Sequence, residues 1–369
     1  MDSPEKLENQ EQQKPIVPAQ ESFLEKLSST LFDLLERFNM NLEGNTRLLV
    51  FGTFALFVTM WLLTVYWSFE PDLLDVSAEV EARATDKTQK IVPGYASTLT
   101  LIRISETLLD KPGGYISNDK LPPWVFMDNI PNWEFGVLKQ VRDFAKAMRE
   151  DIARAQTLDE EHPDLVKAEP RFNVDSNSWM MPSAEGEYRK GAEHLEDYLD
   201  KVANPKDSSA QFYARADNLR HWMTTATRRL GSLSKRLNAS VGEVRFNTNL
   251  AGAEGAQQST SESRQIETKT SWWEIDDIFY EARGTSWALI NLLYAIEIDF
   301  KEVLEDKKAM ASLKQIIREL EATQSTLWSP MVLNGSDFGL FANHSLIMSA
   351  YISRAATGLR DLRDLLARG

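Results

Sequence analysis

Residues 271–284 (SWWEIDDIFYEARG) are the acidic stretch with the best spacing for chemistry. On a helix, Glu274, Asp277 and Glu281 would share one face, with Arg283 some way round it. Three carboxylates beside aromatic rings could bind a cation, or could act as general acids if burial raised their pKa. The simpler interpretation, which we favour, is an acidic first helical turn stabilised by the helix dipole, with Arg283 as counter-charge. These three residues are therefore weak candidates for catalysis.

Residues 334–345 (NGSDFGLFANHS) form the second unusual stretch, because glycines and small polar residues alternate with aromatic ones. A functional interpretation makes Asn343 and His344 hydrogen-bonding groups that line a pocket. The favoured interpretation is structural: Asn343 or Ser345 caps the last helix, and the glycines allow tight turns. His344 is the fourth weak catalytic candidate.

The chain lacks the common catalytic and cofactor-binding motifs. The four histidines (His162, His194, His221 and His344) are scattered, and none has the HExxH spacing of a zinc enzyme. There is no cysteine, which excludes disulfides, thiol catalysis and thiolate metal sites. No GxSxG, P-loop or GxGxxG motif is present. We therefore expect no metal and no cofactor, and favour a non-catalytic protein.

Composition predicts a folded, acidic protein. The chain has 369 residues, of which 43% are hydrophobic and 26% charged, enough to bury a large core. Its net charge of −14 argues against a nucleic-acid partner, since phosphate binding needs a concentrated basic surface.

One segment predicts a transmembrane helix. Leu48–Trp67 (LLVFGTFALFVTMWLLTVYW) carries no charge, and twenty helical residues rise about 30 Å, the thickness of the bilayer's hydrocarbon core. Trp61, Tyr66 and Trp67 gather toward one end, where amphipathic rings favour the headgroup layer. A cleaved signal peptide is disfavoured, because the apolar run is too long and begins too far along the chain. The lipid bilayer is thus the expected partner of this segment.

The flanks of the span predict its surroundings and orientation. Residues 1–20 are polar and should be a disordered tail, whereas 21–44 carry one apolar stripe typical of an amphipathic helix that ends at Gly44. Arg47 abuts the span on one side, and Glu70 and Asp72 follow it on the other. This asymmetry favours a cytoplasmic N-terminus and a domain of residues 70–369 on the far side.

Residues 70–369 are expected to fold as a large helical bundle, so the fold class is mainly α. Apolar residues recur at three- and four-residue steps in several segments, and 287–300 are apolar all round, which indicates a central buried helix. Residues 111–123 are rich in proline and glycine, and 159–185 lack helical periodicity, so both should be loops. Around 243–270, alternating residues flank a Gly/Ser/Gln-rich middle, which predicts a small β-hairpin or simply a loop. This region could also divide the domain into two halves, 94–240 and 271–369.

Several strings of rare residues resemble one protein family. They are PGGYISND (112–119), NIPNWEFGVL (129–138), QFYARADNLR (211–220), SWWEIDDIFYEARG (271–284) and NGSDFGLFANHS (334–345). Together they resemble an uncharacterised family of proteobacterial inner-membrane proteins, a domain of unknown function. The resemblance implies a Gram-negative cell envelope and one membrane anchor, but no activity and no catalytic residues.

Three functional hypotheses follow. The favoured one is a membrane-anchored periplasmic scaffold or accessory subunit of a cell-envelope complex, with a protein partner in the envelope. The second is an enzyme acting on envelope polymer or lipid through Glu274, Asp277, Glu281 or His344. The third is a ligand-binding sensor domain.

Overall fold

The computed structural model describes residues 44–154, 160–204, 206–207, 209–246, 265–329, 331–336 and 340–368. The expected tail 1–20 and the amphipathic helix 21–44 lie outside these ranges, apart from Gly44, which is the first residue of helix α2. The chain divides into two compact units, residues 1–62 and 63–369.

The described part of the first unit is most of helix α2 (Gly44–Trp67), whose last residues belong to the second unit. Within α2, Leu48–Trp67 is long and apolar enough to cross a membrane, and none of the residues in its most apolar window is buried. Leu48, Phe57 and Trp61 all expose more than half of their side chains. The segment therefore differs from the buried core helix of a soluble protein, which can have a similar composition but hides it.

The second unit is built almost entirely of helices, which confirms the mainly α fold. Its longer elements are α3 (Val76–Asp86), α4 (Tyr95–Asp110), α5 (Asn129–Ala147), α6 (Pro163–Phe172), α7 (Ala184–Val202), α8 (Ala216–Asn238), α9 (Ile275–Asp299), α10 (Lys301–Asp306), α11 (Met310–Glu321) and α12 (His344–Ala367). Short turns of other helix types join them: η1 (Trp124–Phe126), η2 (Met148–Ile152), η4 (Trp272–Glu274) and η5 (Ala322–Gln324). Strands β1 (Glu243–Phe246) and β2 (Gln265–Thr268) pair antiparallel, with Glu243 opposite Thr268, so of the two interpretations of 243–270 the hairpin is confirmed.

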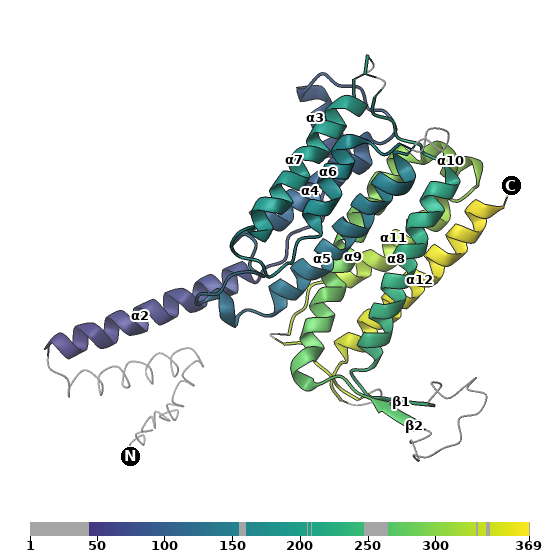
Figure 1. Ribbon diagram of the computed structural model, residues 1–369. Helices are drawn as coiled ribbons and strands as arrows, with labels where there is room; N and C mark the ends of the chain where they lie inside the picture. The colour runs from purple at the N-terminus through teal and green to yellow at the C-terminus, as the bar shows by residue number, and fades with distance from the viewer. Residues whose placement is uncertain are drawn as a thin grey trace, which may run out of the picture. The chain divides into compact units, whose positions relative to one another are not determined.

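Helices α5 and α9 pass through the middle of the bundle, between α4, α6 and α7 on one side and α8 and α12 on the other (Figure 1). The expected burial of residues 287–300 is confirmed, because Trp287, Leu289 and Leu293 are almost entirely excluded from solvent. One continuous apolar core joins all the long helices of this unit. The division into halves 94–240 and 271–369 stays a prediction.

Two glycines allow α5 and α9 to touch through their backbones. A Cβ atom on Gly136 would lie 2.7 Å from the Thr285 backbone nitrogen, and one on Gly284 would lie 2.8 Å from the Trp133 carbonyl carbon. Real Cβ atoms do not approach backbone atoms so closely, so any side chain here would push the helices apart. The close crossing also packs the ring of Trp133 against that of Trp287, with centroids 5.2 Å apart and the ring planes tilted by 57°.

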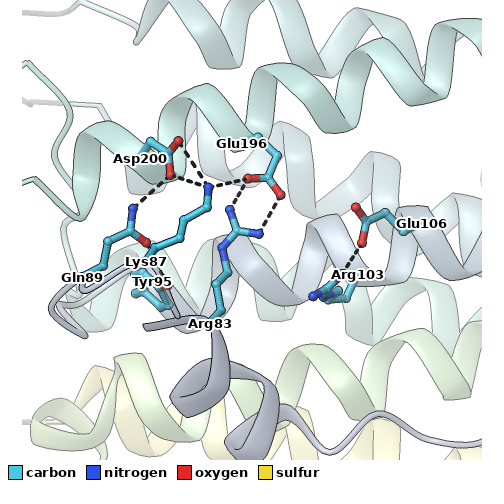
Figure 2. Close-up of polar contacts among 8 residues, drawn as sticks. All are labelled: Arg83, Lys87, Gln89, Tyr95, Arg103, Glu106, Glu196 and Asp200. Carbon is cyan, nitrogen blue, oxygen red and sulfur yellow. Dashed lines mark hydrogen bonds and ion pairs between the residues drawn. The ribbon is translucent and has the colours of Figure 1, made fainter. Parts of the chain in front are cut away.

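A charged network holds α3 against α7 (Figure 2). The Arg83 guanidinium donates to both carboxylate oxygens of Glu196, one of them at 2.8 Å. Lys87 and Gln89 both donate to Asp200, at 3.1 and 3.0 Å. Bidentate guanidinium–carboxylate pairs fix geometry as well as supplying energy, so the network sets where the first helix of the bundle lies.

Residues 159–185 are not the long loop that the sequence predicts, because they contain helix α6. His162 caps this helix and Pro163 is its first residue. Leu165, Ala168 and Phe172 form a short buried stripe. The stripe escapes a periodicity search because the helix has only ten residues and contains Pro170, which usually ends a helix.

Candidate functional site

Glu274 and Asp277 lie where the N-termini of α5 and α9 meet. Glu274 is the last residue of η4 and precedes the first residue of α9. The expectation that it shares a helical face with Asp277 and Glu281 is therefore wrong. Asp277, in the first turn of α9, accepts a hydrogen bond of 2.6 Å from the Asn132 side chain of α5. Asp128, the capping residue of α5, faces the same region.

This environment disfavours negative charge on Asp277. Burial, followed by the neighbouring carboxylates of Asp276 and Asp128, raises its pKa from 3.8 to about 6. Burial likewise raises the pKa of Asp276. A carboxyl with such a pKa can exchange a proton near neutral pH, which is the property expected of a general acid.

The pKa of Asp277 predicts a pH-dependent stability effect of the substitution Asp277→Asn. Between pH 3.8 and about 6 the folded chain holds a proton on Asp277 that the unfolded chain has lost, so this group stabilises the fold less as the pH rises. The asparagine variant lacks the charge at this half-buried position and keeps an acceptor for Asn132. We expect it to melt higher than the wild type at about pH 8, with the difference shrinking toward about pH 5. Thermal unfolding of the full-length protein in detergent measures this. An equal difference at both pH values would contradict the assignment.

Glu281 has a different role from the other two acids. Its carboxylate is buried and pairs with Lys139 of α5 at 2.7 Å and with Arg236 of α8 at 2.8 Å. Burial alone would raise its pKa, but the hydrogen bonds from Arg236 and Lys139 outweigh burial and hold the pKa below its usual range. Glu281 thus joins three helices. Among the described residues, no three histidine or acidic side chains are arranged to hold a metal ion.

His344 lies apart from the acids, at the start of α12. Its Nδ1 accepts a 3.1 Å hydrogen bond from the Leu333 backbone, and its ring lies beside that of Phe279. Burial lowers the pKa of His344. The neighbouring Asn343 caps α12 by accepting from the Leu346 backbone at 2.9 Å, as expected. His344 therefore holds the loop before α12 in place and also lines an apolar hollow of about 490 Å³.

A polar groove of about 850 Å³ lies between α5 and α8. Glu281, Lys139 and Arg236 all line this groove. On its walls Arg229 pairs with Asp143 at 2.7 Å, and His221 lies 3.3 Å from Asp151. Charges of both signs line the groove, so it suits a ligand that is polar or carries both charges.

Gln140, which lines this polar groove, has a buried side-chain amide without a hydrogen-bond partner among the described residues. It lines the groove, yet it is almost entirely buried, and neither its amide oxygen nor its amide nitrogen has a partner among the described residues. The indole nitrogen of Trp222, which also lines the groove, is likewise without a partner there. An unsatisfied buried polar group costs about 1–3 kcal/mol. Gln140 and Trp222 therefore place two donor nitrogens and one acceptor oxygen, all buried and without a partner among the described residues, next to the groove.

The sequence itself indicates that Gln140 is unusual, through a pattern that a search for catalytic motifs does not use. It stands between Val137 and Phe144, at three- and four-residue steps, and so interrupts the apolar stripe of α5. A polar residue within a buried stripe needs a partner or a function. The acid spacing and the histidines each supply one residue of this groove, Glu281 and His221, but neither points to Gln140.

The geometry defines a helical-bundle protein with one long apolar helix before the bundle. A family profile described as an uncharacterized protein conserved in bacteria (DUF2333) matches residues 41–369. The chain belongs to this family, which agrees with the resemblance found in its sequence strings. No curated protein and no solved structure matches the chain.

Proposed function

We propose that the protein is a membrane-anchored, non-catalytic scaffold or accessory subunit of a complex in the bacterial cell envelope. The observation that carries this proposal is α2, whose segment Leu48–Trp67 is long enough to span a bilayer, with most of its large apolar side chains exposed and none of the residues in its most apolar window buried. The short N-terminal region would lie in the cytoplasm and the helical domain in the periplasm, since Arg47 precedes the span and acids follow it.

The roles of the candidate catalytic residues support a non-catalytic function. Glu281 neutralises two cations between helices, and His344 accepts from a backbone amide. Asp277 meets an asparagine at a helix junction. These groups do not converge on one reacting position, as acid–base catalysis would require. The alternative of an enzyme acting on envelope polymer or lipid would depend on Asp277, the one candidate whose pKa is raised.

The proposal is tested on membranes from cells that express the full chain. We expect the protein to stay in the membrane pellet after alkaline carbonate washing and to be cut by protease added to spheroplasts. Solubilisation in mild detergent and affinity purification should recover a second protein in stoichiometric amount. Release by carbonate would refute the anchor. Protection from protease would refute the orientation, and recovery of the chain alone would refute the scaffold role.

The polar groove favours a second function, the binding of a small polar ligand that carries an amide or a similar donor–acceptor pair. Gln140 supports it, because a buried amide without partners destabilises the fold and is better explained by a ligand than by packing. If so, Gln140→Met should stabilise the ligand-free protein by about 1–3 kcal/mol, since it removes the unsatisfied groups at similar volume.

Chemical denaturation of the full-length protein in detergent measures this effect. Gln315→Met, on the exposed face of α11, is the matched control and should leave stability within about 0.5 kcal/mol of the wild type. A loss of stability in Gln140→Met would show that the amide is satisfied within the fold, and it would remove the argument for a ligand.

A further inference from the structure

Exposed apolar side chains of the helical domain gather at one end of the bundle. Beyond Trp67, sixteen large apolar side chains are exposed among the residues that the structure describes. Two of them, Ile91 and Val166, lie elsewhere. The other fourteen, called here the aromatic rim, are Phe69, Leu121, Val125, Phe126, Trp179, Met180, Met181, Trp272, Trp273, Trp328, Met331, Leu340, Phe341 and Ile347.

The rim residues come from segments far apart in the sequence that meet because the helices alternate in direction. The C-terminal end of α4 and the N-terminal ends of α5, α7, α9 and α12 lie at this end of the bundle (Figure 1). Hydrogen bonds join the segments directly: Tyr115 donates to the Ser176 carbonyl at 3.1 Å, and Asn118 donates to the Ser178 carbonyl at 3.1 Å. The rim is therefore one surface of the folded domain.

The chain enters the helical domain at the same end. Trp67, the last residue of the apolar helix, stacks on Trp124 with ring centroids 5.2 Å apart and packs beside Met127 and Ile130. Three residues after the solvent-exposed Phe69, the chain reaches α9, where the Asp72 carbonyl accepts a hydrogen bond from the Trp287 indole at 3.0 Å.

Glu70 stabilises the junction between the apolar helix and the helical domain. Its carboxylate meets the Arg283 guanidinium at 2.6 Å, and Arg283 also donates to the carbonyls of Thr323 and Ser325, which precede the rim residue Trp328. The junction between the apolar helix and the domain thus lies at the same end of the bundle as the rim and is tied to the segment that precedes Trp328.

We propose that the aromatic rim is a membrane-contacting surface, which inserts its side chains into the interfacial layer of the bilayer around the anchor. The inference rests on the proposed anchor, because a span that ends at Trp67 places that residue, and the surface around it, at the boundary between lipid and water. Tryptophan favours this layer, where its ring is apolar and its N–H stays hydrated.

The shape of the rim fits lipid better than a protein partner. Trp328 is 92% exposed, Met181 86% and Leu340 100%, so these side chains protrude singly from different loops. A fluid lipid surface can surround each one, whereas a protein interface has a packed core. Carboxylates of Asp128, Glu274 and Asp276 lie in the same region, so apolar insertion rather than attraction to anionic lipid drives the contact.

The absence of cysteine allows a direct test in the full-length chain. Single cysteines at Met181, Trp273 and Trp328 carry an environment-sensitive fluorophore after reconstitution in phosphatidylcholine vesicles. The matched controls are cysteines at Ile91 and Val166, the two exposed apolar positions outside the rim. Nitroxide-labelled lipid should quench the fluorescence of the rim fluorophores by about half or more and that of the controls by about a tenth or less. Iodide in the buffer should quench the control fluorophores more strongly than the rim fluorophores.

A cysteine at Phe57, within the apolar helix, separates the two proposals. If its fluorophore escapes the lipid quencher, the anchor fails and the rim proposal fails with it. If it is quenched while the rim fluorophores behave like the controls, only the rim proposal is overturned. Rim fluorophores shielded from iodide but not quenched by lipid would assign the surface to a protein contact, which also overturns the proposal.

Discussion

Replacing Glu134 by alanine should destabilise the helical domain by about 3–5 kcal/mol, the largest effect expected of any single substitution discussed for this protein. Glu134 of α5 pairs with Lys111, and their side chains are 0% and 1% exposed. The carboxylate also accepts from the backbone of Ile116 at 2.9 Å and of Ser117 at 2.8 Å. Alanine would leave the buried Lys111 ammonium without its counter-charge and two backbone amides without an acceptor.

The loss should be visible as a lower midpoint of denaturation of the full-length protein in detergent. Glu187→Ala is the control, because Glu187 is also buried but its partners Arg171 and Lys190 are largely exposed and can be hydrated by water instead. We expect a much smaller loss there. Equal losses in the two variants would show that the Lys111–Glu134 pair has no special importance.

Replacing Gly284 by alanine should destabilise the domain by about 3 kcal/mol, because the new methyl group would press on the Trp133 backbone of α5. The neighbouring element is a helix and not a flexible side chain, so the clash is relieved only if α5 and α9 separate and the contacting rings of Trp133 and Trp287 shift. A changed near-ultraviolet circular dichroism signal should accompany the lower melting temperature.

The matched control is Gly231→Ala in α8, where an added Cβ meets nothing within 4 Å. At that position alanine should stabilise the helix by about 0.5–1 kcal/mol through its higher helix propensity. Opposite signs at the two glycines would confirm that the α5–α9 crossing, and not helix propensity, decides the result. A gain at Gly284 would contradict the close crossing.

The helices themselves were predictable because their information is local. Leu219, Met223, Ala226 and Leu230 recur at helical steps, and all four are buried in α8. The uncharged run from Leu48 to Trp67 needs no knowledge of the fold to be recognised as long enough for a bilayer. The prediction failed at α6, where ten residues and an internal proline leave too short a pattern.

The candidate sites were harder to predict, because the partner of each polar group lies far along the chain. The sequence predicts that Glu281 lies on one helical face with Asp277 as a candidate acid. In the structure Glu281 forms a salt bridge with Arg236, 45 positions earlier in the chain, and so has a structural role. Gln140 became notable only once α5 and α8 were seen to enclose a groove. Spacing within one helix describes a face, but it does not state what packs on that face.

The sequence by itself determined a helical domain preceded by one bilayer-length apolar helix, since both depend on the periodicity and hydrophobicity of contiguous residues. Only the tertiary structure decided which acids are neutralised, which side-chain amide has no partner in the part of the chain that the structure describes, and that scattered tryptophans such as Trp179, Trp273 and Trp328 share one end of the bundle. The physical reason is that burial and pairing arise between helices, from contacts that chain folding creates across many tens of residues.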